Sequence, residues 1–132
     1  MKTSMLRRFL CTNAIDYYSL PSSGEHESMH NQSEKLKWLR QGKAALKELA
    51  NNLGAIATLS TNPSGDIDRG YVSGFFSKNG KVVYIQFSDG CKNILFRTAE
   101  HIKDYTGGRN NDAPLTGMGS DRLTEWLKNE LN

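Results

Sequence analysis

The dipeptide Asn79-Gly80 constrains this chain most, because it lies between two segments in which apolar and polar residues alternate. Asn-Gly is typical of the two-residue turn that joins antiparallel strands, since both turn positions take a positive φ. The flanking segments, Tyr71–Ser77 and Lys81–Ser88, are therefore predicted to form a β-hairpin.

A turn at Asn79 and Gly80 also fixes which residues of the two strands face each other. One face is then apolar or glycine throughout: it pairs Phe76 with Val83, Gly74 with Ile85 and Val72 with Phe87. The other face pairs Ser77 with Val82, Phe75 with Tyr84, Ser73 with Gln86 and Tyr71 with Ser88. A slip of one residue would move every side chain to the opposite face, so this separation favours the register.

Helices are predicted on both sides of the hairpin region. Ser33 is a good N-cap for a helix to about Leu53, and Gly54 is placed to end it in the left-handed conformation. Ser120 is the predicted cap of a last helix. Each helix has one apolar stripe, made by Leu36, Leu39, Leu46, Leu49 and Leu53 in the first and by Leu123, Trp126, Leu127 and Leu131 in the last.

Two further strands complete the predicted fold. Ala55–Thr61 precedes the hairpin, and Asn93–Ala99 follows it. The prediction is an α+β fold with the order α-β-β-β-β-α, in which an antiparallel meander of three to four strands has both helices on one face. Residues 1–32 are expected to form a polar N-terminal arm, and residues 33–132 a single compact domain.

Composition limits the location of the chain. No apolar run approaches the ~18 residues that a membrane-spanning helix needs. Cys11 and Cys91 fit neither a disulfide framework nor a zinc spacing. We therefore expect a cytoplasmic protein that does not bind membranes. The net charge of +3 permits an anionic partner without requiring one.

Candidate catalytic and metal-binding residues are sparse. Lys92 stands beside Cys91 and would lower a thiol pKa, but a strand-edge cysteine is the simpler interpretation. His26, His30 and His101 make no ligand spacing, and Asp66-Ile67-Asp68 lacks the rest of a calcium loop. We predict no catalytic residue, no metal site and no cofactor.

The segment Thr106-Gly107-Gly108-Arg109-Asn110-Asn111 is a candidate anion site. Paired glycines present backbone N–H groups to an anion, although neither a Walker motif nor a dinucleotide fingerprint is present. A turn-rich loop is the alternative. Arg97, Lys103 and Arg109 converge on this part of the sequence, so they are candidate binding residues.

The polar face of the hairpin carries Tyr71, Phe75 and Tyr84, with Arg69 and Lys81 nearby. Exposed aromatic rings among basic residues are typical of sheets on which single-stranded bases stack. The alternative is that Phe75 and Tyr84 form a stabilising cross-strand pair that the N-terminal arm or a partner shields. The three rings are accordingly predicted as an outward-facing binding surface.

Residues 93–111, which include the run Arg97-Thr98-Ala99 and the sequence Lys103-Asp104-Tyr105-Thr106-Gly107-Gly108, resemble a segment of small accessory proteins of plasmids, phages and integrative elements. The resemblance implies a mobile element, where proteins of this size often inhibit host defence or assist transfer.

Three functions follow as expectations. The first is a non-enzymatic binding or inhibitory protein, such as an anti-defence protein, that contacts a host protein or nucleoprotein complex. The second is a single-stranded nucleic-acid-binding module that uses Tyr71, Phe75 and Tyr84. The third is a small enzyme for a phosphate-bearing substrate that uses Arg97, His101, Lys103 and Arg109.

Overall fold

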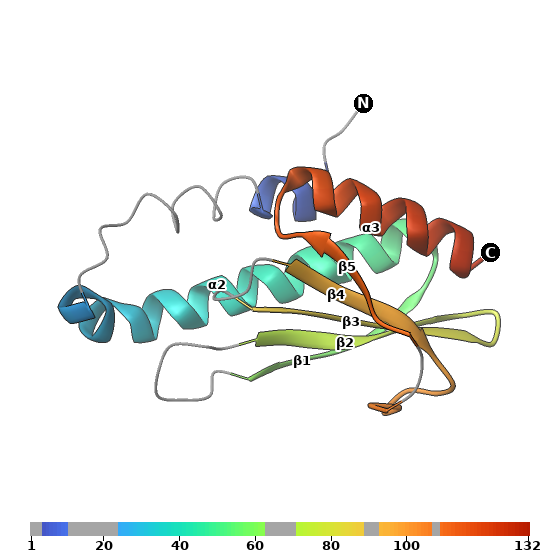
Figure 1. Ribbon diagram of the computed structural model, residues 1–132, viewed down its shortest axis with the longest axis horizontal. Helices are drawn as coiled ribbons and strands as arrows, with labels where there is room; N and C mark the ends of the chain where they lie inside the picture. Colours follow the sequence, from blue (N-terminus) through green and yellow to red (C-terminus); the bar gives the residue numbers. More distant parts are fainter. Residues whose placement is uncertain (1–3, 11–23, 63–70, 89–92, 107–108) are drawn as a thin grey trace.

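The computed structural model describes residues 4–10, 24–62, 71–88, 93–106 and 109–132, with the backbone alone for residues 24–35. A short helix over residues 5–10 precedes the other elements: α2 (Gly24–Leu53), β1 (Ile56–Asn62), β2 (Tyr71–Lys78), β3 (Lys81–Ser88), β4 (Asn93–Ala99), β5 (Asn111–Pro114) and α3 (Gly117–Glu130). The strands form one antiparallel sheet in the order β1-β2-β3-β4-β5, with the helices on one face (Figure 1). The predicted α+β meander is confirmed, with one strand more than expected.

The β2–β3 hairpin has the predicted register. Phe76 lies opposite Val83, and Phe75 lies opposite Tyr84. Asn79 and Gly80 have φ values of 53° and 80°, as the two-residue turn requires. The chain therefore sorts its hairpin side chains onto two faces, which we call the inner face, toward the helices, and the outer face.

The inner face forms the main core with the helices. Five hairpin side chains are fully or almost fully buried there: Val72, Phe76, Val83, Ile85 and Phe87. They are joined by most of the predicted leucine stripes: Leu39, Leu46 and Leu49 of α2 and Leu123 and Leu127 of α3, with Leu131 just beyond. Leu36, predicted in the same α2 stripe, is 45% exposed and does not belong to the core. Burial of each such side chain contributes about 1.5–3 kcal/mol, so this layer supplies most of the stability.

The α2 helix ends as predicted but begins earlier. Gly54 has a φ of +72°, and the N–H of Ala55 donates to the carbonyl of Ala50 at 2.8 Å, which closes the helix end. At its other end α2 starts at Gly24, so Ser33 lies within the helix and is not its cap. The preference of serine for a cap is local and weak, and the helix overrides it.

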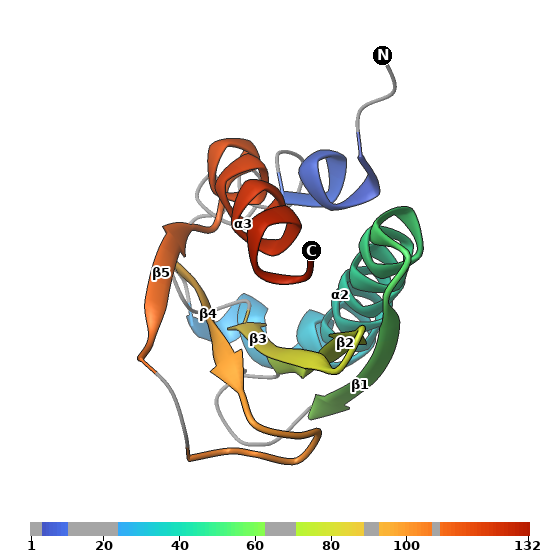
Figure 2. The same ribbon diagram turned by 90° about the vertical axis from the view of Figure 1, so that its right-hand side faces the viewer.

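The helix over residues 5–10 packs against α2 and α3 (Figure 2). Leu6, Phe9 and Leu10 are buried in the main core, and the ring of Phe9 lies 5.3 Å from that of Trp38. Arg7 forms an ion pair with Asp121. This part of the predicted N-terminal arm therefore belongs to the packed structure. A helix this short is not stable alone, so its local sequence gives little sign of it.

The chain between β4 and α3 contains a fifth strand, β5, which is not among the strands predicted from the sequence. α3 begins after Thr116, whose Oγ1 accepts a hydrogen bond from the N–H of Gly119 at 3.3 Å. The predicted cap, Ser120, lies inside the helix instead. Its hydroxyl is buried and has no hydrogen-bond partner among the described residues.

Replacement of the two hydroxyl residues separates the real cap from the predicted one. Thr116→Ala removes the acceptor for a first-turn N–H and should lower the free energy of unfolding by about 1 kcal/mol. Ser120→Ala removes a buried hydroxyl without a partner, so it should be neutral or stabilising. Urea denaturation of both variants measures this difference, and a larger loss in Ser120→Ala would contradict the assignment of the cap.

Gly74 allows β1 and β2 to approach closely. A Cβ atom there would lie 2.4 Å from the carbonyl oxygen of Thr58 and 2.8 Å from the Cα of Leu59. Both contacts are with backbone, which cannot rotate away. Gly74→Ala should therefore lower the free energy of unfolding by about 2 kcal/mol or more in urea denaturation. Ser60→Ala, an exposed change on the same strand pair, is the control and should have little effect.

Candidate functional site

The outer face of the sheet holds most of the predicted binding residues. Pairing places Thr58, Phe75, Tyr84 and Arg97 side by side in one row across β1, β2, β3 and β4. The connection from β4 to β5 runs beneath this face, on the side away from the helices (Figure 2). We call residues 100–106 of this connection the outer loop.

Three aromatic rings form a cluster between the sheet and the outer loop. The ring of Phe75 lies 5.1 Å from that of Tyr84, and the ring of Tyr105 lies 5.4 Å and 6.0 Å from the two, edge-on to both. Phe75 and Tyr84 are only 2% and 7% exposed, whereas Tyr105 is 63% exposed. Phe75 and Tyr84 face the outer side as predicted, but the prediction that they are accessible is wrong, because the outer loop folds back over them.

Tyr71, the third predicted aromatic residue, lies on the same outer face but is half-buried. Its hydroxyl accepts a hydrogen bond from Nδ2 of Asn62 at 2.9 Å. Asn62 and Tyr71 are also opposite each other in the β1–β2 pair. Tyr71 thus remains accessible in part, at the end of the strand pair.

Arg97 is buried under the outer loop with 4% exposure. Its Nη2 donates to the carbonyl of Asp104 at 2.8 Å, and its Cζ lies 4.7 Å from the centre of the Tyr84 ring. A guanidinium over an aromatic face gains a cation–π attraction that strengthens when water is excluded. Arg97 therefore connects the sheet, the aromatic cluster and the outer loop.

Asp104 shapes the outer loop. Its carboxylate accepts hydrogen bonds from the N–H of Glu100 at 2.9 Å and from the N–H of Thr106 at 3.2 Å. The N–H of Asp104 donates to the carbonyl of His101 at 3.1 Å, which closes a tight turn. Within that turn Lys103 has a φ of +80°, a value that favours glycine. The loop is thus held in one shape from inside, even where its backbone is strained.

The three predicted basic residues do not converge on one anion. Arg97 is buried beneath the outer loop, while Lys103 and Arg109 are exposed to solvent. The predicted glycine pair, Gly107-Gly108, lies outside the described residues. His101 is exposed, and its Nδ1 lies 2.7 Å from the carbonyl oxygen of Ile102.

Other sequence candidates also fall outside the description: Cys11, Cys91, Lys92, Arg69, Asp66 and Asp68, together with the side chains of His26 and His30. Among the residues that are described, no group of three histidine, cysteine or acidic side chains is placed to hold a metal ion. Within the same residues no helix combines the length and the apolar character needed to cross a membrane.

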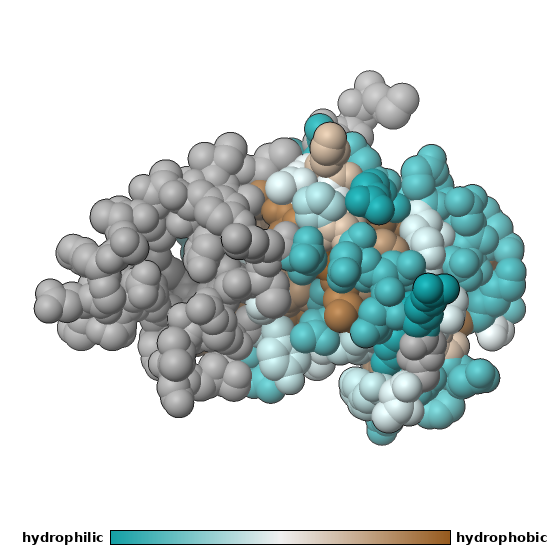
Figure 3. Space-filling view, viewed as in Figure 1, coloured by the Kyte–Doolittle hydropathy of each residue, from teal (hydrophilic) through white to brown (hydrophobic). Residues whose placement is uncertain are grey.

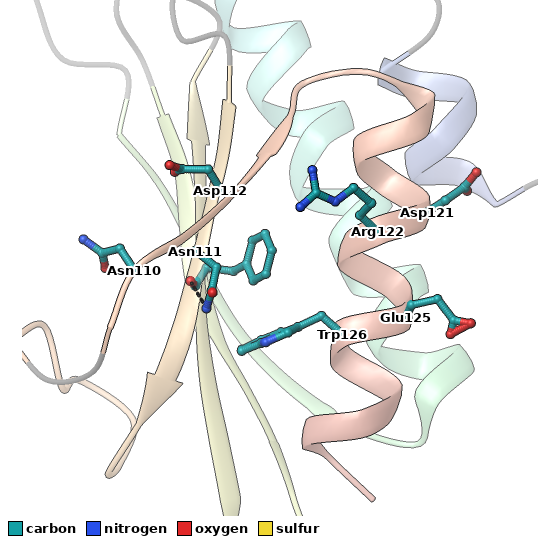
Figure 4. Close-up of a pocket in the computed structure, with 8 residues that line it drawn as sticks. Asn110, Asn111, Asp112, Asp121, Arg122, Glu125 and Trp126 are labelled. Carbon is teal, nitrogen blue, oxygen red and sulfur yellow. Dashed lines mark hydrogen bonds between the residues drawn. The ribbon is translucent and has the colours of Figure 1, made fainter.

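A groove of about 710 Å³ lies between β5 and α3 (Figure 4). The rings of Phe96 and Trp126 pack 4.8 Å apart beside it, and the side chain of Asn111 donates to the carbonyl of Phe96. Asp121 and Glu125 point away from the sheet, while Arg122 extends from α3 into the space toward β5 (Figure 4). The described residues that line the groove include no histidine, cysteine, serine or threonine.

Sequence reasoning missed Tyr105 and Asp104 as parts of this site. Their signal is an aromatic residue next to an aspartate in a polar, strand-free segment. Comparisons of the chain with protein-family models, with curated proteins and with solved structures give no match. The functional conclusion therefore depends on the geometry of the outer face.

The buried hydroxyl of Tyr84 makes stability depend on alkaline pH. Burial raises the pKa of Tyr84 above its ordinary value of 10.0, while its hydroxyl donates to Oε1 of Gln86 at 2.8 Å. Above pH 10.0 the unfolded chain loses this proton before the folded chain does, so stability should fall with rising pH. Chemical denaturation across this range should show a smaller fall for Tyr84→Phe, and an equal fall would contradict the assignment.

Proposed function

We propose that this chain is a non-enzymatic binding protein of a mobile genetic element, which acts by contact with a host protein or nucleoprotein complex. The outer loop is the proposed contact surface. The observation that carries the proposal is Tyr105, a ring that is mostly exposed and yet is fixed against two buried rings.

An exposed ring that is already immobilised is suited to binding. Tyrosine is enriched among the residues that dominate the energy of protein interfaces. Ordering a side chain at an interface costs roughly 0.5–1.5 kcal/mol, and a ring held by Phe75 and Tyr84 has met part of this cost before the partner arrives. Ile102, a second exposed apolar side chain, extends the contact surface on the same loop.

The charges around Tyr105 favour an anionic partner surface. Lys103 and Arg109 are exposed, as is Glu100, whereas Asp104, the other acidic residue of the outer loop, is buried and accepts hydrogen bonds from loop N–H groups. The exposed cations thus outnumber the exposed carboxylate. Charges at the rim of an interface chiefly raise the association rate. Elsewhere, the described part of the face in Figure 3 is mostly hydrophilic, so it offers little apolar surface for recognition.

The mobile-element context rests on the resemblance of residues 93–111. This segment includes β4, Arg97 and the whole outer loop. An anti-defence protein that works in the cytoplasm of the host is one such protein, because it needs only to occupy a surface on its target.

Single-stranded nucleic acid is the second candidate partner. Phe75 and Tyr84 are too buried to stack on bases, but Tyr105 and part of Tyr71 remain accessible on the outer face. A phosphate-directed enzyme has less support, because Arg97 is already engaged by the Asp104 carbonyl and the Tyr84 ring.

A photo-crosslinker distinguishes the proposed contact surface from the rest of the molecule. Benzoylphenylalanine at position 105 should form a discrete adduct in host-cell lysate, because the partner covers that ring. The same group at Met118, which is 69% exposed on α3, is the matched control and should give none. Mass spectrometry of the adduct identifies the partner, and equal labelling at the two positions would refute the proposed surface.

Fluorescence anisotropy with a labelled single-stranded oligonucleotide decides between the two partners. Nucleic-acid binding should weaken steeply as salt rises, and Tyr105→Ala should reduce it because a stacking ring is lost. If no oligonucleotide binds at low salt and a protein adduct forms at position 105, the nucleic-acid partner is excluded and the protein partner is supported.

A further inference from the structure

The free edge of β1 is a second surface that the outer loop does not involve. β1 pairs with β2 along one side, and no other strand in the described part of the chain pairs with its second side. The segment Ala55–Asn62 contains no charged residue and no proline. Most of its residues are exposed, including Ile56 at 71%.

Along residues 56–61 such an edge presents N–H and C=O groups that no strand in the described part of the chain pairs with. Natural sheets usually protect a free edge with charged side chains, proline or a covering element. β1 has neither of the first two, and α2 lies above the sheet on its inner side (Figure 2). As far as the described residues go, the backbone of β1 can therefore accept an added strand, in which main-chain hydrogen bonds give affinity and alternate side chains give specificity.

The flank of α2 next to this edge is positively charged. Leu36, Arg40, Lys43 and Lys47 are exposed and recur at intervals of four, three and four, so they share one flank of the helix. Trp38 lies on the opposite flank, where its ring is 5.3 Å from that of Phe9 in the N-terminal helix. Glu48, the only acidic residue among the described α2 side chains, lies between the two flanks and accepts a hydrogen bond from the N–H of Met5 at 2.8 Å. That opposite flank faces the N-terminal helix, so the cationic flank is on the β1 side (Figure 2).

We propose that β1 binds an extended acidic segment of a partner protein as a sixth strand. Side chains of the added strand that point to the inner side would lie beside Ala57, Leu59 and Thr61, beneath the α2 flank. Carboxylates at these alternate positions meet Lys43, Lys47 and Arg40. A second copy of this chain fits less well, because self-pairing through β1 would bring two cationic flanks together.

A peptide of alternating valine and glutamate, blocked at both ends and labelled with fluorescein, tests the edge directly. It should bind the full chain in fluorescence anisotropy. The same peptide with lysine at every glutamate should have an affinity at least roughly tenfold lower. Lys43→Glu combined with Lys47→Glu should weaken the glutamate peptide by a similar factor. Lys128→Glu, an exposed charge reversal on α3, is the matched control and should leave binding unchanged.

Backbone methylation separates strand addition from simple charge attraction. In an antiparallel or parallel pair only alternate N–H groups of the peptide point to its neighbour. Methylation of one alternate set should therefore abolish binding, and methylation of the other set should be tolerated. Equal effects of the two sets, equal binding of the lysine peptide, or no binding at all would each overturn the proposal.

Two further outcomes would assign the β1 edge to another occupant and would therefore also overturn the proposal. One is a free protein that sediments as a dimer and dissociates when the peptide is added. The other is an oligonucleotide that binds through Lys43 and Lys47 while the peptide does not. Tyr105→Ala should leave peptide binding unchanged, so failure here is distinguishable from failure of the outer-loop proposal.

Discussion

The pairing of β2 with β3 determines where every other part of this molecule lies. Its register turns Val72, Phe76 and Phe87 to the inner face, and it turns Phe75 and Tyr84 to the outer face. The inner set is covered by helices and belongs to the hydrophobic core. The outer set is a single pair of rings with polar neighbours. It offers too little apolar surface for a helix to pack against. One register thus creates a stable core on one side and a small aromatic patch on the other.

The way in which that patch is covered explains the shape of the proposed contact surface. A loop with few apolar side chains cannot be held by burial alone, so polar groups fix it: the Asp104 carboxylate organises the turn, and the Asp104 carbonyl receives Arg97 from the sheet. Arg97 is costly to bury, and its hydrogen bonds to carbonyls together with the Tyr84 ring offset that cost. Tyr105 contacts Phe75 and Tyr84 in edge-type ring pairs, and most of its side chain stays exposed to solvent.

Local signals were enough to predict much of the fold. Asn79-Gly80 gave the register because a two-residue turn leaves no freedom in the pairing, and Gly54 marked the end of α2 because few other residues take its φ of +72°. β5 was missed because Asn111–Pro114 is short, does not alternate and ends in proline. The helix over residues 5–10 and the start of α2 were missed because distant packing, rather than local propensity, stabilises them.

The candidate site was predictable only in part, for the same reason. Strand pairing places Phe75, Tyr84 and Arg97 in one row. The two aromatic residues were predicted as binding residues from the hairpin register, and Arg97 was predicted from its charge. Whether the rings are open depends on Tyr105 and Asp104, which are distant from Phe75 in sequence and carry no periodic signal. Pairing predicts which side a residue faces, but it does not predict what covers that side.

The edge of β1 has two opposing requirements: protection against unwanted strand pairing, and access for a partner strand. The position of the charges around β1 meets both. Charged side chains on the strand itself would disfavour strand addition in general. Placed on α2, the same charges repel a second copy of this chain and attract a strand that carries carboxylates, while the strand backbone stays uncovered. In this proposal the charges on α2 take the protective role that charged side chains on an edge strand usually have. Selectivity at this edge thus depends on a helix above it rather than on the strand that forms it.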